Sequence, residues 1–410
     1  MLSLPATSIA HSTTWGHDGP VKRLVVCCDG TWAKPDNKFV TNVEKIARTI
    51  QIDSASAGGV PQLVYYISGV GSGSFAADRL LGGAFGFGLS HNVIACYRFL
   101  AQNYEPGDEL FIFGFSRGAY TARSLAGMIA KVGLLTRRSL VEERLRDAVH
   151  IYQRERLAEG SFGASTGEFT HDHCYAPRVR FLGVFDTVGA LGVPGFRWRT
   201  PKFHDVALSD QVDCARHALA IDETRLIFAP TLWELPDGAA EGTSVLDGRV
   251  KQVWFEGAHS DVGGGYEESG LSDTALLWMA REARREGLIF DVSLLSLYIN
   301  SGSDPIRHSP LNALYRVYNA ILQAKMSLLR RNHAPEFREG LRILGNERAL
   351  SVRVASSAMN HFQAATFEPT NPYEPTNLQN FAEATGPSGT AQESVTALPE
   401  ADVDLSTLAA

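Results

Sequence analysis

The sequence contains no apolar run long enough to cross a bilayer, because its apolar stretches are short and interrupted by glycine or polar residues. A signal peptide has a Lys or Arg ahead of an apolar core, and residues 1–19 do not show this pattern. These two absences predict a soluble chain without a cleaved signal. We expect it in the cytoplasm by default, with export by a signal-independent route left open.

Positive charge is also scarce. The chain has 38 Lys and Arg against 45 Asp and Glu, for a formal net charge of −7. An excess of negative charge does not attract nucleic acid or an anionic membrane surface. We therefore expect no nucleic-acid partner, and any contact with a membrane surface should be local and transient. The oligomeric state is left open by the sequence.

Cysteine is rare as well, and its five positions do not form a disulfide framework. They are odd in number and scattered along the chain: Cys27, Cys28, Cys96, Cys174 and Cys214. The adjacent Cys27 and Cys28 lie in an apolar run with no Cys-x-x-Cys or His-x-x-x-His spacing nearby. We interpret them as buried strand residues, and we predict neither a metal site nor a cofactor.

What the chain has is enough apolar sequence for a large core. It is 410 residues long and 44% hydrophobic, which allows one large α/β domain or two smaller ones. We expect an N-terminal extension over 1–20 and a catalytic domain over 21–385. Residues 386–410 are polar, acidic and rich in Pro, Ser, Thr and Ala, which predicts a disordered tail.

Short apolar runs alternate with longer helical patterns, which is typical of a mostly parallel central sheet with helices on both faces. The predicted strands are 23–29, 63–70, 109–115, 179–185 and 250–255. The predicted helices are 43–52, 92–101, 140–157 and 311–331, and 159–172 is expected to be a loop.

The segment from Gly114 to Gly118, GFSRG, matches the Gly-x-Ser-x-Gly nucleophile elbow, in which a tight turn between a strand and a helix projects the serine hydroxyl. Ser116 follows an apolar run and precedes a helical pattern, as the elbow requires. The pattern occurs a second time around Ser165, in a polar segment without a preceding strand. We therefore predict Ser116 as the nucleophile.

A serine nucleophile needs a base, and a histidine base needs an acid that orients it. His259 follows the predicted strand 250–255 in a glycine-rich loop, so it is the expected base. Asp186 follows the strand 179–185 and preserves the chain order Ser, Asp, His of α/β-hydrolases. Asp261 is the rival acid. Weaker acids, on an expected helix, are Asp213 and Asp222, and the structural histidines are His91, His204 and His217.

An ester intermediate also needs backbone N–H donors for its oxyanion. Arg117, directly after the proposed nucleophile, and a residue of the Gly30–Thr31 turn fit these two places. Alternatively, the preceding Asp29 only caps a turn at the end of the first strand, and the sequence leaves both readings open.

Five ordered motifs together resemble a known family. They are CCDGTW, YYISGVGSG, GFSRGAYTAR, FLGVFDTVGALG and GAHSDVGGGY. The set resembles an α/β-hydrolase family of uncharacterised enzymes that includes the catalytic domains of type VI secretion phospholipase effectors. The resemblance spans about residues 21–380 and implies a serine, aspartate and histidine triad acting on lipid or phospholipid esters. It carries over to Ser116 and His259. A secreted effector of this kind is expected to carry a large added region. We do not recognise one in this sequence, so the resemblance implies the toxin role less strongly than the hydrolase.

Two other functions stay open. Asp29, His259 and Asp261 would supply oxygen and nitrogen ligands to a metal-dependent hydrolase, although this leaves the elbow around Ser116 unexplained. A non-catalytic binding protein on a hydrolase scaffold would need a broken triad. The glycines of 69–73 lack the spacing of a nucleotide-binding loop.

The segment 196–203, FRWRTPKF, alternates aromatic and basic residues. Such a pattern suits contact with lipid headgroups and phosphates. We expect Arg197, Trp198 and Arg199 to border the substrate entrance because they follow Asp186 closely. The alternative is an exposed loop whose aromatic side chains pack on the core.

Overall fold

The computed structural model describes most of the chain between residues 22 and 393. The described residues are 22–30, 38–69, 85–157, 164–188, 208–234, 248–299, 306–310, 316, 319–320, 337–338, 341–345, 349–364, 373–385 and 392–393. Several expectations lie outside this part: the extension 1–20, Thr31, the entrance residues Arg197, Trp198 and Arg199, and most of the helix expected over 311–331. Gln392 and Glu393 belong to the segment expected to be disordered, yet they form a short strand.

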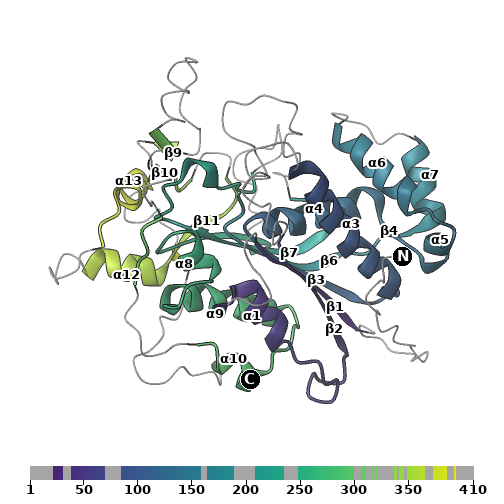
Figure 1. Cartoon of the computed structure of the whole chain (residues 1–410), viewed down its shortest axis with the longest axis horizontal. Coiled ribbons are helices and arrows are strands. Elements are labelled where there is room, and N and C mark those ends of the chain that lie inside the picture. The colour runs from purple at the N-terminus through teal and green to yellow at the C-terminus, as the bar shows by residue number, and fades with distance from the viewer. Residues whose placement is uncertain are drawn as a thin grey trace.

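The central sheet has eight strands, and every neighbouring pair runs parallel (Figure 1). The order across the sheet is β12-β11-β8-β7-β6-β3-β1-β2. The strands are β1 (Arg23–Cys28), β2 (Gln62–Ile67), β3 (Glu109–Phe115), β6 (Val179–Phe185), β7 (Val212–Ala220), β8 (Val250–Phe255), β11 (Val352–Ala355) and β12 (Gln392–Glu393). Short strand pairs outside this sheet are β4 (Leu134–Leu135) with β5 (Cys174–Tyr175), and β9 (Phe337–Arg338) with β10 (Leu341–Arg342).

Helices cover both faces of the sheet, as expected from the sequence (Figure 1). One face carries α1 (Asn42–Thr49), α9 (Gly270–Arg285), α10 (Val292–Ser296), α12 (Ser356–Ala364) and α13 (Thr376–Thr385). The other carries α3 (Phe85–Asn103), α4 (Arg117–Val132), α5 (Arg137–Val141), α6 (Leu145–Leu157) and α7 (Ala164–His173). The fold class expected from the sequence is therefore confirmed.

The strand order reverses at β1. The chain passes from β1 to β2 at the edge and then returns to place β3 on the other side of β1. Helix α1, which follows β1, and helix α4, which follows β3, consequently cover opposite faces. Open α/β sheets bind ligands at such a reversal, beyond the carboxyl ends of the strands. The fold thus directs attention to the residues after β1 and β3.

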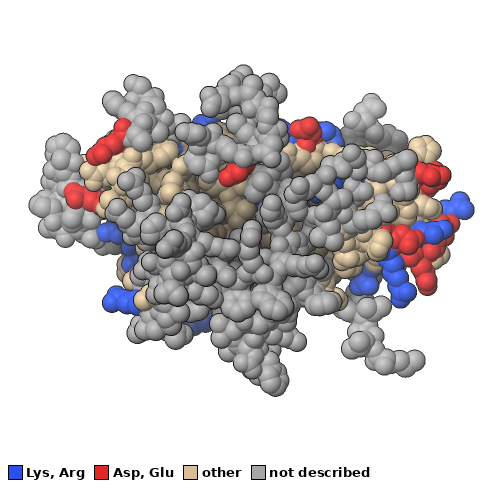
Figure 2. Space-filling view, turned by 90° about the horizontal axis from the view of Figure 1, so that it is seen from above, with Lys and Arg blue, Asp and Glu red and all other residues tan. Residues whose placement is uncertain are grey.

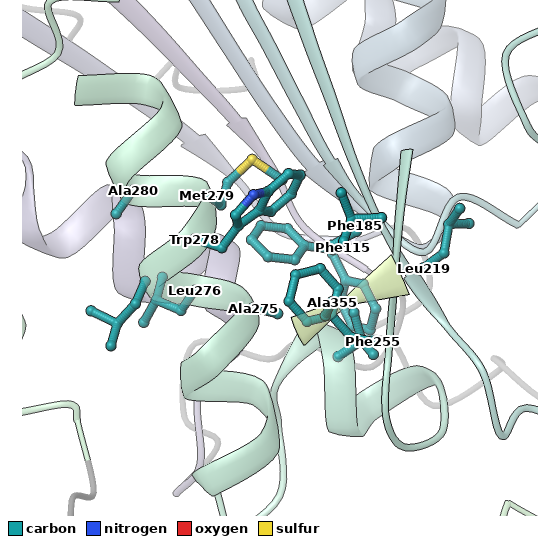
Figure 3. Packing of buried hydrophobic residues seen from close by; sticks show 14 of the residues in the cluster. Phe115, Phe185, Leu219, Phe255, Ala275, Leu276, Trp278, Met279, Ala280 and Ala355 are labelled. Atoms are coloured by element: carbon teal, nitrogen blue, oxygen red, sulfur yellow. The ribbon is translucent and has the colours of Figure 1, made fainter. Parts of the chain in front are cut away.

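A large apolar cluster fills the space between the sheet and α9 (Figure 3). Phe115, Phe185 and Phe255 end three strands of the sheet and pack with Trp278 and Met279 of α9. All five side chains are buried, and burying an aromatic or methionine side chain stabilises a fold by roughly 1.5–3 kcal/mol. The cluster lies directly beneath the strand ends, so it fixes their positions.

Some local predictions were wrong. The segment 212–220, where Asp213 was expected on a helix, is strand β7, and Asp222 lies in a bend after that strand. Residues 164–172, part of the loop expected over 159–172, belong to helix α7. The single helix expected over 140–157 is divided by a turn, in which Glu143 has a positive φ of 60°. The strands over 109–115, 179–185 and 250–255 have the predicted bounds.

The surface combines both signs of charge. On the face shown in Figure 2, acidic and basic side chains of the described residues lie intermixed toward both ends of the molecule. Among the helices of the described residues, none has the length and apolar character that a membrane span requires.

Candidate functional site

Ser116 occupies a strained turn between β3 and α4. Its backbone has φ 58° and ψ −121°, a conformation that favours glycine and is uncommon for a serine. The two flanking glycines allow the turn to pack. A Cβ on Gly114 would come within 2.5 Å of the Gly118 carbonyl oxygen, and a Cβ on Gly118 within 2.1 Å of the Cys28 carbonyl oxygen. The local geometry is therefore that of a strand-turn-helix elbow with a serine at its tip.

The second Gly-x-Ser-x-Gly match has a different environment. Ser165 lies within the first turn of helix α7, and a Cβ on Gly167 would meet no atom within 4 Å. No strand of the described residues ends at this position. Close packing thus requires glycine in the first match and not in the second.

His259 and Asp186 form a buried hydrogen-bonded pair. His259 Nδ1 lies 2.6 Å from Asp186 Oδ2, and both side chains are almost fully enclosed. Asp186 directly follows β6, with a positive φ of 37°, and His259 begins the short helix α8 (His259–Gly263) after β8. The structure therefore brings together the histidine and the first-choice aspartate predicted from the sequence.

The pair is joined to the serine turn through backbone and ring contacts. The Ser116 N–H donates to the carbonyl oxygen of Phe185, the residue before Asp186, at 3.0 Å. The Phe115 ring lies with its centroid 4.6 Å from that of His259. Since β3 and β6 are neighbours in the sheet, Ser116 and Asp186 lie at adjacent strand ends. Ser116 itself is 7% exposed.

Arg342 of β10 also binds the Asp186 carboxylate. Its two terminal nitrogens lie 2.7 Å from Oδ1 and 3.0 Å from Oδ2, and the side chain is completely buried. The Ala220 N–H also donates to Oδ1, at 3.0 Å. Burial by itself raises the pKa of Asp186, but Arg342 and His259 outweigh it and hold that pKa well below its ordinary value. Asp186 is therefore ionised near neutral pH.

The environment of His259 favours the neutral imidazole. Burial lowers its pKa below the ordinary value, while the contact with Asp186 opposes this shift. Arg225 contributes to the lowering and Glu223 opposes it. These two residues pair at 2.7 Å, and Glu223 also accepts from the His259 N–H at 3.3 Å. A neutral histidine is the form that can accept a proton.

Asp261, the rival acid, has other partners. Its Oδ1 lies 2.6 Å from His308 Nδ1, and its Oδ2 accepts from the Ala258 N–H at 2.9 Å. No hydrogen bond joins it to His259 among the described residues. Asp261 instead caps α8, since the Ala258 contact satisfies an N–H at the start of that helix.

The region expected to hold the oxyanion is described in part. Arg117 is the first residue of α4, and a Cβ on Gly30 would lie 3.3 Å from Ser116 Cβ. The Gly30 N–H, however, donates to Asp29 Oδ1 at 2.6 Å. Asp29 also accepts from the hydroxyls of Thr41 and Tyr66, each at 2.7 Å. Burial raises the pKa of Asp29 to about 6.

The residues of the metal-site alternative do not meet. Asp29 is bonded to Thr41 and Tyr66, His259 to Asp186, and Asp261 to His308. Within the described ranges, no group of three His, Cys, Asp or Glu side chains could hold a metal ion.

Sequence reasoning missed Arg342, Glu223 and Arg225. Glu223 follows β7 closely, so its place after a strand was an available signal once β7 was recognised. Arg342 lies 156 residues from Asp186, in the segment FREGLRIL of residues 337–344. Nothing local marks it, because an arginine is ordinarily exposed and only the fold supplies its buried partner.

Comparisons with known proteins agree with the motifs. A family model described as "T6SS, Phospholipase effector Tle1-like, catalytic domain" matches residues 22–282. An uncharacterised protein of Saccharomyces cerevisiae, YEL023C, is 32% identical over 239 residues, which are 52% of this chain and 34% of that protein. The chain thus spans about a third of this relative.

Two solved structures overlap in part. One is the Tle1 effector bound to the VgrG spike of the type VI secretion system, with a TM-score of 0.38, 15% identity, and coverage of 81% of this chain and 87% of that chain. The other is an uncharacterised protein from Pseudomonas aeruginosa, with a TM-score of 0.41, 15% identity, and coverage of 95% and 66%. These TM-scores are too low to carry an assignment. The family assignment rests on the match to the family model, which covers well over half of the chain and confirms the resemblance. The protein belongs to the Tle1-like family of type VI secretion phospholipase effector catalytic domains.

Proposed function

We propose that the protein is a serine hydrolase that cleaves carboxylic esters of lipids or phospholipids. In this proposal Ser116 is the nucleophile, His259 the general base and Asp186 the acid that orients it. The observation that carries it is the strained elbow at Ser116, bonded to the strand end that holds the buried Asp186–His259 pair. A backbone strained in this way persists only where the surrounding structure imposes it, and such sites cluster at active centres.

The contacts support a two-step acyl transfer. Because Nδ1 of His259 is engaged by Asp186, Nε2 is the nitrogen that takes the Ser116 proton as the serine oxygen attacks the ester carbonyl carbon. The tetrahedral intermediate expels the alcohol, which takes the proton back from His259, and an acyl-serine remains. Water, deprotonated by the same nitrogen, then attacks the acyl carbon. The second tetrahedral intermediate expels the Ser116 oxygen, which takes the proton from His259, and the fatty acid leaves.

The oxyanion of each intermediate needs donors that are already in place. The Arg117 N–H, at the start of α4, supplies one, and the positive end of the helix dipole favours the negative charge. The second donor belongs to the turn after β1, where Gly30 packs against Ser116 and Thr31 follows. If Gly30 is that donor, its N–H must release Asp29 when substrate binds.

Lipid esters are proposed as substrates because the family is one of phospholipase effectors. In this proposal, contact with the membrane surface is local to the substrate entrance. The residues proposed to border that entrance are Arg197, Trp198 and Arg199. The acyl-enzyme mechanism needs no metal ion, so turnover should survive a chelator.

The test compares Ser116→Ala with Ser165→Ala on phospholipid vesicles and on a soluble short-chain ester, with and without a chelator. Ser116→Ala should lower the rate by several orders of magnitude, as removing a triad nucleophile does. Ser165→Ala removes the serine of the other Gly-x-Ser-x-Gly match. It is the control and should retain the wild-type rate. Substantial turnover by Ser116→Ala, or loss of activity with the chelator, would contradict the proposal.

A further inference from the structure

A completely buried arginine, Arg342, contacts the same carboxylate as His259. Arg342 donates to both oxygens of Asp186, and its terminal nitrogens also donate to the carbonyl oxygens of Ala220, at 2.8 Å, and Phe228, at 2.5 Å. The Asn377 side chain of α13 in turn donates to the Arg342 carbonyl oxygen, at 3.3 Å. This arginine thus lies at the centre of a network that joins β6, β7, β10 and α13.

A fixed cation here changes the balance of charge in the pair. A fully buried carboxylate is costly, and a single histidine that is itself mostly neutral cannot compensate for it. The forked guanidinium matches both carboxylate oxygens and remains charged at all working pH values. It therefore keeps Asp186 ionised and fixes the orientation of Oδ2, the oxygen that faces His259.

Arg342 also binds a residue whose aromatic ring packs against His259. The Phe228 carbonyl that it binds belongs to the residue whose ring packs edge-on against His259, with centroids 4.7 Å apart. The Arg225 guanidinium lies 3.9 Å from the centre of that same ring. One side chain therefore fixes both the hydrogen-bond partner and one packing partner of the imidazole.

We propose that Arg342 is a positioning residue for the catalytic acid, and that it sets the pH range in which the enzyme works. This inference rests on the proposed function, because it assigns Arg342 to the same triad. Arg342 does not contact Ser116 or the substrate in the proposal. It acts through Asp186, whose charge and orientation it determines.

The direction of the pH effect follows from the charges that face the pair. Asp186 faces Arg342, His259 and the neutral His217, and His259 faces Asp186, Glu223 and Arg225. Without the Arg342 charge, burial raises the pKa of Asp186, and the unshared carboxylate raises the pKa of His259. The active form needs Asp186 ionised and His259 neutral. With either pKa raised, this form is reached only at a higher pH. Both contributions move the acid limb of kcat/KM toward higher pH.

The experiment measures pH profiles of kcat/KM for wild type, Arg342→Gln and Arg342→Lys on a soluble ester. Arg342→Gln should shift the acid limb upward by roughly one to three pH units, the usual effect of one adjacent opposite charge on a carboxyl group. Arg342→Lys keeps the charge but loses the fork. Its limb should stay near that of wild type, with a lower kcat and an unchanged KM.

Arg216→Gln is the matched control. Arg216 is another buried arginine of the sheet, paired with Glu282 of α9 and away from the triad. Its loss should lower stability without moving the acid limb. If Arg342→Gln does not fold, Arg342→Lys and the downfield proton resonance of the His259–Asp186 hydrogen bond provide the test. That resonance should change in Arg342→Lys and not in Arg216→Gln.

The outcomes separate this inference from the proposed function. Turnover that persists in Ser116→Ala would reject the triad itself. Loss of turnover in Ser116→Ala, together with a wild-type acid limb in Arg342→Gln, would leave the triad in place and overturn the role of Arg342. An unchanged kcat and resonance in Arg342→Lys would overturn it as well.

Discussion

Asp186 accepts hydrogen bonds from three separate parts of the chain: His259 after β8, Arg342 in β10 and the backbone of Ala220 in β7. The sequence predicts that Asp186→Asn is stable and slow, because His259 loses its orienting partner. The structure changes the first half of that prediction. An asparagine leaves Arg342 as a buried, unneutralised cation, which costs about 3–5 kcal/mol when one partner of such a pair is removed.

We therefore expect Asp186→Asn to lower both the rate, by about 10⁴-fold, and the free energy of unfolding. Asp261→Asn, the rival acid, should cost at most a few kcal/mol and leave the rate within about tenfold. Urea unfolding beside ester kinetics measures both quantities. A mild Asp186→Asn and an inactive Asp261→Asn would transfer the orienting role to Asp261.

The backbone of Ser116 gives a second prediction at this scale. A non-glycine residue at its φ of 58° and ψ of −121° costs on the order of 1–3 kcal/mol. Ser116→Gly relieves that strain and loses about 0.5–1 kcal/mol to the flexibility of glycine in the unfolded chain. We expect an inactive protein that is about 1 kcal/mol more stable.

Ser165→Gly provides the comparison, because it places glycine inside the regular helix α7. It should be destabilising by about 0.5 kcal/mol. Thermal or urea unfolding of the two variants checks the pair. A loss of stability in Ser116→Gly would argue that the elbow is not strained.

At the scale of elements, the close contact between β1 and the start of α4 requires a glycine, without a side chain, at position 118. A Cβ on Gly118 would lie 2.1 Å from the Cys28 carbonyl oxygen and 2.4 Å from that of Asp29, and these backbone atoms cannot move aside cheaply. We expect Gly118→Ala to cost about 3 kcal/mol or more through overpacking. Gly167, the equivalent glycine of the second motif, has open space, so Gly167→Ala should stabilise α7 by up to about 1 kcal/mol.

Circular dichroism melts of the two glycine variants measure this difference. Similar melting temperatures for Gly118→Ala and Gly167→Ala would show that the close approach of α4 to β1 is not required.

The elements also show where sequence patterns were sufficient. Strands β3, β6 and β8 were predicted with their bounds because continuous apolar runs are typical of strands buried on both faces. Strand β7 was missed because its sequence, VDCARHALA, contains charged residues that only the fold neutralises. Arg216 pairs with Glu282, and His217 accepts from the Thr187 N–H at 3.1 Å.

The candidate site divides in the same way. Ser116, Asp186 and His259 were predictable because each directly follows, or closely follows, a recognisable strand, and strand ends gather at one edge of a parallel sheet. Arg342 was not predictable, because its role depends on a contact across 156 residues. Likewise, only the fold shows that Asp261 is hydrogen-bonded to His308, whereas Asp186 is hydrogen-bonded to His259.

At the scale of the whole molecule, the site depends on sequence beyond the family match, which ends at residue 282. Arg342 lies after it, as do His308, strand β11 and Asn377, whose side chain donates to the Ile221 carbonyl oxygen at 2.9 Å. A fragment ending at residue 299 keeps Ser116, Asp186 and His259 but leaves Asp186 without its buried cation and exposes the edge of β8.

We expect that fragment to lack ester hydrolysis and a cooperative thermal transition, because both the carboxylate and the apolar residues beneath β11 lose their partners. Differential scanning calorimetry and ester kinetics, beside the full chain, check this. A cooperative and active fragment would show that residues 300–410 are dispensable for the triad.

The central claim is that Ser116 is activated by the Asp186–His259 pair, and an active-site-directed organophosphonate tests it most directly. Intact-mass measurement after reaction, followed by peptide mapping, should show a single adduct per chain on Ser116. The adduct should be absent in Ser116→Ala and form much more slowly in His259→Ala, because the serine hydroxyl then has no base. An adduct on another residue, or equal labelling of Ser116→Ala and wild type, would contradict the account.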